Sequence, residues 1–138
     1  MKRLTILLAS AALLTGCLTT TKDHVLDSGP ETQLQKRSYQ SRTFDTPDAN
    51  KVMRSCISTL QDLGFMIDNA DAKLGSLTAT RYGSGIRMTI VIRKRGESQT
   101  LVRANAQYGN RAMTNPKDYQ DFFNSLEKSL FLTANAAD

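Results

Sequence analysis

Three successive segments in which apolar and polar side chains alternate constrain the fold of this chain more than any other feature. They are GSLTATRY, IRMTIVIRKR and SQTLVRANAQY, at residues 75–82, 86–95 and 98–108. A period of two is typical of half-buried β-strands, because successive side chains point to opposite faces of a sheet. Gly83 and Ser84 predict a two-residue hairpin loop, and residues 95–97 predict a second short loop. We therefore expect an antiparallel sheet.

The two loops predict a register in which one face of the sheet is consistently apolar. The predicted cross-strand pairs are Leu77–Ile90, Ala79–Met88, Ile90–Val102 and Met88–Ala104. The apolar face then holds Leu77, Ala79, Ile86, Met88, Ile90, Ile92, Val102, Ala104 and Ala106. A slip by one residue would bring polar side chains onto this face, which disfavours it.

The opposite face is polar and basic, with two apolar residues among its charges. The stretch from Lys73 to Arg111 holds eight basic residues and one acidic residue, Glu97. This face supplies the residues that we predict as an interaction surface: Arg87, Val91, Arg93, Leu101 and Arg103.

Two amphipathic helices flank the predicted strands. In the first, Thr46 is the expected N-cap, Pro47 the first helical residue and Gly64 the stop, with Asp48 in the first turn. Its buried face is predicted to contain Ala49, Val52, Met53, Cys56, Ile57, Leu60 and Leu63. In the second, Asn115 is the expected cap before Pro116, and the buried stripe is Tyr119, Phe122, Phe123, Leu126 and Leu130.

These elements predict one α+β domain over residues 38–132. A strand from Ser38 precedes the first helix, and a short strand over Phe65–Asp68 follows it, so the order is β-α-β-β-β-β-α. One apolar sheet face and two amphipathic helices predict a two-layer sandwich, with both helices packed on that face. Residues 133–138 are expected to be a frayed tail.

The N-terminus has the layout of an export signal. Basic residues precede a short apolar run from Leu4 to Leu14, which is too short to span a membrane, and LTGC follows at residues 14–17. This motif resembles the lipobox of bacterial lipoproteins. The resemblance implies a signal peptide at 1–16, which is removed, and acyl chains, commonly palmitate, on Cys17. Several chains on one residue anchor a protein stably.

The residue after the lipidated cysteine bears on localisation. In enterobacterial lipoproteins an aspartate at that position retains the protein in the inner membrane, and this chain has Leu18 there. The resemblance thus implies an outer-membrane protein that faces the periplasm. Residues 17–37 are polar and without a period, which predicts a flexible tether, and His24 is expected to be a solvated residue within it. With Cys17 lipidated, Cys56 has no disulfide partner and is expected in the core.

The predicted domain also resembles the helix-grip domains of outer-membrane lipoproteins, including the lipoprotein of the β-barrel assembly machinery. The segments that carry this resemblance are RTFDTPDANKVMRSCISTLQDLGFMI and DAKLGSLTAT. The assembly lipoprotein has two such domains and this chain has one, so we expect a separate small family of lipoproteins with this fold.

Residue patterns that would support catalysis are weak. YGSG at 82–85 joins two strands and precedes no helix, so it predicts a hairpin and not a phosphate-binding loop. Asp68 and Asp71 have no histidine beside them, and Ser55 and Ser58 have no base nearby in sequence. We therefore expect no enzymatic activity, no cofactor and no metal.

The basic face allows two interpretations. Arginine and lysine on strands keep a sheet soluble and discourage edge pairing. Alternatively, this face binds an acidic envelope protein, anionic lipid or cell-wall carboxylates; nucleic acid would suit the charge, but export disfavours it. The leading hypothesis is a non-enzymatic adaptor that binds another envelope component through the basic face or a strand edge. A binding module for an amphiphile, held between helices and sheet, is the alternative, and an unrecognised hydrolase is third.

Overall fold

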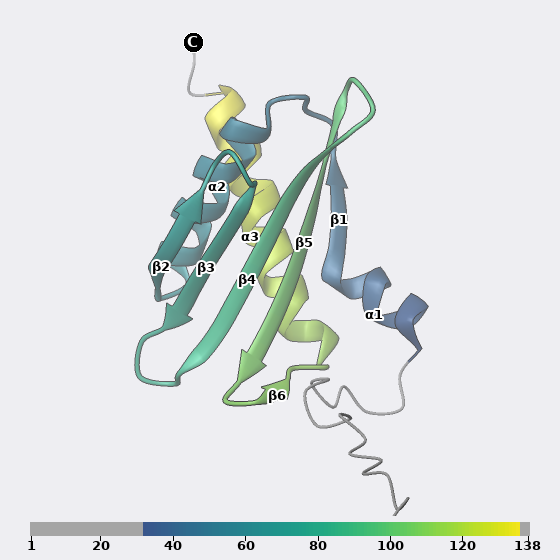
Figure 1. Ribbon diagram of the computed structural model, residues 1–138. Coiled ribbons are helices and arrows are strands. Elements are labelled where there is room, and N and C mark those ends of the chain that lie inside the picture. Colours follow the sequence, from purple (N-terminus) through teal and green to yellow (C-terminus); the bar gives the residue numbers. More distant parts are fainter. Residues whose placement is uncertain (1–31, 136–138) are drawn as a thin grey trace, which may run out of the picture.

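Six strands form one antiparallel sheet in the computed structural model, which describes residues 32–135 (Figure 1). The strand order is β1-β5-β4-β3-β2, and the two-residue strand β6 pairs with the far end of β5. In chain order the elements are α1 (Gln33–Gln40), β1 (Ser41–Phe44), α2 (Ala49–Asp62), β2 (Phe65–Asp71), β3 (Ser76–Arg81), β4 (Ile86–Arg95), β5 (Gln99–Tyr108), β6 (Arg111–Ala112) and α3 (Pro116–Asn135).

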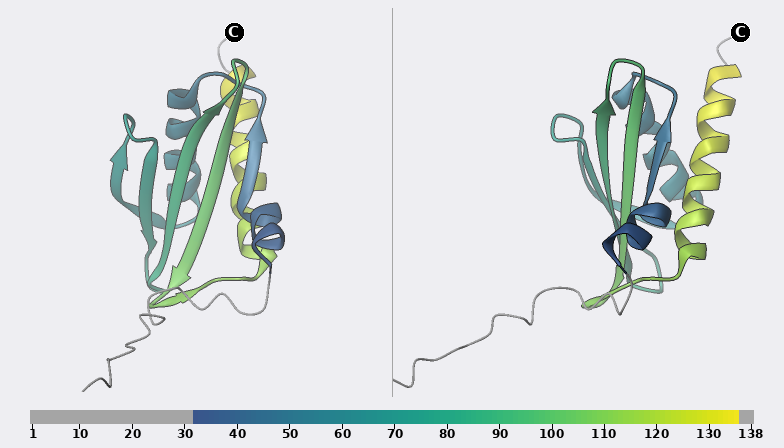
Figure 2. Two further views of the ribbon diagram at one scale, coloured as in Figure 1. Left: turned by 45° about the vertical axis from the view of Figure 1, so that its right-hand side comes forward. Right: turned by 90° about the vertical axis from the view of Figure 1, so that its right-hand side faces the viewer.

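Helices α2 and α3 contact each other and cover one face of the sheet, whereas no described helix covers the other face (Figure 2). This is the predicted two-layer α+β sandwich, with one addition at its start. The short helix α1 lies beside β1 and contacts α3. The two-layer arrangement follows because α2, α3 and the sheet are amphipathic and each has one apolar side to bury.

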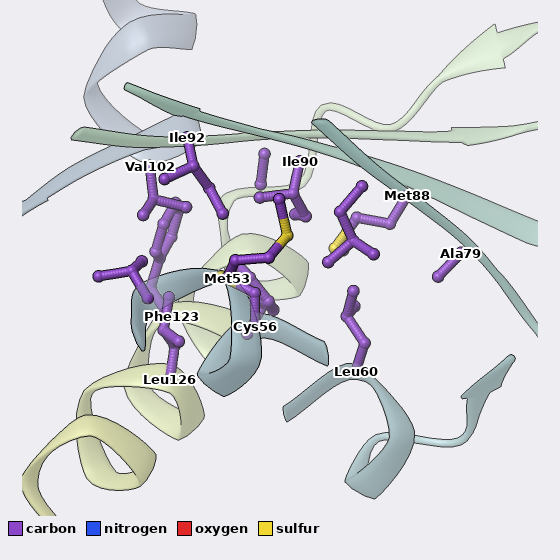
Figure 3. Packing of buried hydrophobic residues seen from close by; sticks show 14 of the residues in the cluster. Met53, Cys56, Leu60, Ala79, Met88, Ile90, Ile92, Val102, Phe123 and Leu126 are labelled. Carbon is purple, nitrogen blue, oxygen red and sulfur yellow. The ribbon is translucent and has the colours of Figure 1, made fainter. Parts of the chain in front are cut away.

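The core lies between the sheet and the two helices (Figure 3). Met53, Cys56 and Leu60 of α2 face Ile90 and the neighbouring strand residues. Each of these four residues is at most 5% exposed. The predicted aromatic stripe of α3 is also confirmed. Its residues Tyr119, Phe122, Phe123 and Leu126 are at most 1% exposed, and Leu130 is partly buried.

The predicted register is right for the first hairpin and wrong for the second. Leu77 pairs with Ile90 and Ala79 with Met88, as predicted. In the β4–β5 hairpin, however, Ile90 pairs with Ala104 rather than Val102, a shift of two residues. The reason is that the loop comprises residues 96–98, because Arg95 still pairs with Gln99. A shift of two keeps every side chain on its face, so the apolar face is as predicted.

The loop between β3 and β4 is longer than predicted. The sequence indicated a two-residue loop of Gly83 and Ser84, but the carbonyl of Arg81 accepts a hydrogen bond from the Gly85 amide, at 3.2 Å. Arg81 therefore does not pair with Ile86, and residues 82–85 form the loop. The Gly-rich YGSG segment joins two strands, as the sequence predicted.

Helix α2 begins two residues later than predicted. Its N-cap is Asp48, whose Oδ1 accepts a hydrogen bond from the Lys51 amide at 2.9 Å. Thr46 instead belongs to the connection from β1, where its carbonyl accepts a hydrogen bond from the buried Thr100 hydroxyl at 2.7 Å. Both residue types cap helices well, and this tertiary contact to β5 decides between them.

Two boundaries of the predicted domain also differ. The predicted tether ends at residue 37 and a strand was expected from Ser38, but Gln33–Gln40 form helix α1, and β1 begins at Ser41. Thr32 and Gln35 form a capping box at its start. At the other end, α3 continues to Asn135, so the first residues of the predicted frayed tail are helical. Strand β2 likewise extends past Asp68 to Asp71.

Tyr119 connects three parts of the fold through its hydroxyl. The hydroxyl donates to the Met113 carbonyl at 2.7 Å and accepts from the Ala106 amide at 3.1 Å. It also accepts from Nε2 of Gln40 in α1, at 3.3 Å, and its ring lies 5.2 Å from that of Tyr39. Since β1 pairs with β5 only as far as Arg103, the tyrosine takes the place of a strand partner beyond that point.

Candidate interaction surface

The face of the sheet opposite α2 and α3, which we call the outer face, carries the predicted interaction residues. Its central side chains on β4 are Val91 and Arg93, and those on β5 are Leu101 and Arg103. Val91 and Leu101 are partly exposed, and the arginines are exposed. All four lie on the two longest strands of the sheet, which pair along their full length.

The register brings four of the five predicted residues together. Val91 lies directly opposite Arg103, and Arg93 lies directly opposite Leu101. Side chains of directly opposed residues point to the same face about 5 Å apart. The fifth, Arg87, pairs with Gln107 and lies four residues from Val91 along β4, or about 13 Å at 3.3 Å per residue. Arg87 therefore lies on the same face but apart from the cluster that Val91, Arg93, Leu101 and Arg103 form.

Sequence reasoning missed Arg95, which extends the cluster toward β1. Its Nη1 donates a hydrogen bond to Oγ1 of Thr43 at 2.9 Å. Alternation was the signal that could have found it, because Arg95 lies two residues beyond Arg93 and so shares its face. With Arg95 the outer face presents three arginines around Val91 and Leu101.

The arginines of the outer face are positioned by neutral groups. Nε of Arg103 donates to the Ser41 hydroxyl at 3.4 Å, and Nη1 of Arg93 donates to the Leu74 carbonyl. Within residues 32–135, the single ion pair joins Arg42 and Glu127, at 3.5 Å. Among the described residues, the arginines of the outer face therefore form no ion pair.

Acidic residues near the sheet have local structural partners. Oδ1 of Asp45 accepts from Nε2 of Gln99 at 2.6 Å, and Oδ2 of Asp68 accepts from the Thr80 hydroxyl at 2.6 Å. Oδ1 of Asp71 accepts from the amides of Lys73 and Leu74, both at 2.9 Å, which shapes the turn before β3. Asp68 and Asp71 therefore act as a strand contact and a turn residue rather than as a carboxylate pair.

Cys56 is buried in the core, as the sequence predicted. Its side chain is fully buried, and desolvation raises the pKa of the thiol to about 12 from an ordinary value of 9.0. Because the thiolate is the reactive form, this environment suppresses nucleophilic chemistry. Among the described residues there is also no group of three or more histidine, cysteine or acidic side chains that could hold a metal ion.

A small cavity lies between the sheet and the helices, where the alternative hypothesis would place an amphiphile. It measures about 110 Å³ and is lined by apolar residues such as Phe65, Met88 and Phe122, with Arg81 and Asp121 also present. Ligand pockets commonly measure about 300 to 1,000 Å³. This cavity is too small for an acyl chain.

The lipidation site and the signal peptide lie outside the described residues, as do His24 and most of the predicted tether. From residue 32 to residue 135, no helix combines the length and the apolar character that crossing a membrane requires. No protein-family model matches the chain, and no curated protein matches it either.

Proposed function

We propose that this protein is a non-enzymatic adaptor of the bacterial cell envelope, anchored by acyl chains on Cys17, whose outer face binds an acidic surface of another envelope protein. The observation that carries the proposal is the outer face itself. It is left uncovered by the described helices, and its arginines surround Val91 and Leu101 without forming an ion pair within residues 32–135. The LTGC motif supplies the anchor, and Leu18 indicates the outer membrane, with the domain in the periplasm.

The composition of the outer face suits a protein partner. Arginine is over-represented among residues that dominate binding energy, and it pairs with carboxylates in bidentate geometry. The apolar pair Val91 and Leu101 at the centre would be desolvated on binding, whereas the surrounding charges would steer an acidic partner and fix its orientation. Solubility alone would be served by charges anywhere on the face, without an apolar centre.

The packing of the core favours the adaptor over the amphiphile-binding module. The strand residues that face the helices, such as Leu77, Ile90 and Ala104, are fully buried, and the cavity beside them measures only about 110 Å³. An amphiphile would have to displace this packing, at a cost comparable to removing core side chains, about 2 to 5 kcal/mol each.

Charge reversal on the outer face tests the proposal. Arg87→Glu with Arg103→Glu changes two exposed residues of this face, and Arg54→Glu with Lys128→Glu makes the same charge change on the helices. After crosslinking in intact cells, we expect one envelope protein to co-purify with the wild-type chain and the helix variant, and to be lost from the outer-face variant. Equal recovery from both variants would contradict the proposal, and recovery of anionic lipid alone would identify a membrane surface instead.

A further inference from the structure

A cleft of about 380 Å³ opens at the end of the domain where α2 begins. Its walls are the start of α2, the turn between β2 and β3, and the last part of β4. Met53 and Ile92 are apolar lining residues and are nearly buried, at 5% and 3% exposure. The volume is at the lower end of the range for ligand pockets and suits one or two amino-acid residues rather than a phospholipid.

Basic side chains dominate the charge of this cleft. Lys73, Arg93 and Lys94 line it, and Asp48 is the only acidic residue among its lining residues. Oδ1 of Asp48 accepts the Lys51 amide at 2.9 Å, so this carboxylate already caps the helix. Neither lysine forms an ion pair within the described residues. The cleft thus combines an apolar floor with a net positive rim.

Arg93 links the cleft to the outer face. Its position on β4 is opposite Leu101 on that face, yet its guanidinium reaches the carbonyl of Leu74 in the β2–β3 turn, and the residue lines the cleft. A polypeptide lying across the outer face at Leu101 could therefore continue into the cleft without leaving the protein surface.

The cleft also lies at the end of the domain remote from the N-terminal attachment. Figure 1 shows the β2–β3 turn and the start of α2 at the upper end, whereas α1, where the described chain begins, lies at the lower end. If the chain is anchored through its N-terminal part, this end is the more accessible one for a partner in the periplasm.

We propose that this cleft binds a carboxylate-bearing peptide segment of the acidic partner, with the carboxylate between Lys73, Arg93 and Lys94 and a neighbouring aliphatic side chain against Met53 and Ile92. This inference rests on the proposed adaptor function and specifies the recognition element. The carboxylate could belong to a Glu or Asp side chain or to the end of the partner's chain.

Three synthetic peptides distinguish these sources by isothermal titration calorimetry with the purified full chain. Acetyl-Ala-Leu-Glu-Ala-Leu-amide carries only a side-chain carboxylate, and acetyl-Ala-Leu-Gln-Ala-Leu with a free C-terminus carries only the terminal one. Acetyl-Ala-Leu-Gln-Ala-Leu-amide carries neither. We expect one of the charged peptides to bind at least tenfold more tightly than the uncharged peptide.

Lys73→Ala with Lys94→Ala should weaken that binding about tenfold, because two charge pairs are lost. Lys117→Ala with Lys128→Ala, two exposed lysines on α3, is the matched control and should bind as the wild-type chain does. Ala72→Phe should block the cleft without changing its charge. Binding that is equal for all three peptides, or unaffected by the first double variant and by Ala72→Phe, would overturn the inference. If a partner is still lost on charge reversal at Arg87 and Arg103, the adaptor proposal would stand without it.

Discussion

Removal of a single oxygen atom, in Tyr119→Phe, should destabilise the domain measurably. The ring is fully buried and would stay in place, while its hydroxyl loses the hydrogen bonds to Met113, Ala106 and Gln40. The amide of Ala106 would then be buried without a partner, because β1 does not extend that far along β5. A buried polar group left unsatisfied costs about 1 to 3 kcal/mol.

This loss translates into a melting shift that is easily resolved. For a domain of this size, about 1 kcal/mol lowers Tm by roughly 4 °C or slightly more, so a loss of about 2 kcal/mol should lower Tm by about 8 °C. The assay is thermal unfolding followed by circular dichroism. Tyr82→Phe is the matched control, since Tyr82 is 84% exposed and its hydroxyl has no buried group to satisfy. If the two variants melt within about 1 °C of each other, the role assigned to the Tyr119 hydroxyl is wrong.

Three further outcomes follow from other positions. Cys17→Ser should release the protein from the membrane fraction on cell fractionation, and a variant that still sediments with membranes would contradict the lipid anchor. The Cys56 thiol ionises above about pH 9 in the unfolded chain but only near pH 12 in the folded domain. The free energy of unfolding should therefore decrease as the pH rises from 9 to 12. Urea unfolding should show that Cys56→Ala lacks this component of the decrease. Gly75→Ala should lower Tm by more than Gly83→Ala does. Both glycines have positive φ, but a Cβ at Gly75 would also collide with the Ile92 carbonyl. Equal Tm shifts would refute this steric argument.

The alternation of side chains was sufficient to predict which face of the sheet is buried and how β3 pairs with β4, but not how β4 pairs with β5. A displacement of β5 by two residues leaves the apolar face unchanged, so the pattern could not distinguish Ala104 from Val102 as the partner of Ile90. The loop decides this, and both Arg95 and Gln99 are polar residues that could belong to a strand or to a loop. The pairing of β4 with β5 and the length of their loop therefore required the three-dimensional structure.

Helix α1 was missed although its start has a recognisable signal. Thr32 and Gln35 are spaced as in a capping box, but the helix that follows has no buried residue and thus no apolar stripe. Its contact with the rest of the fold is through Tyr39 and Gln40, which meet Tyr119 far along the chain. Tertiary contacts of this kind leave no periodic pattern in the sequence.

Part of the candidate surface could be predicted from the sequence, because it depends on which face of the sheet each residue occupies. Four of the five proposed residues lie together, since alternation assigns them correctly. Arg95 falls where the sequence predicts a loop, although it pairs with Gln99 as a strand residue. The cleft beside Lys73 and Lys94 could not be predicted, because it is formed by three segments that are remote in sequence.

Site-specific photo-crosslinking in intact cells tests the adaptor function most directly. A benzophenone amino acid is placed at Leu101, in the centre of the outer face, and in a second strain at Lys128, exposed on α3. The proposal predicts that Leu101 captures one envelope protein, and that Lys128 does not capture it. Capture of the same protein from Lys128 alone, or of no protein from Leu101, would contradict the claim that the outer face is the interaction surface.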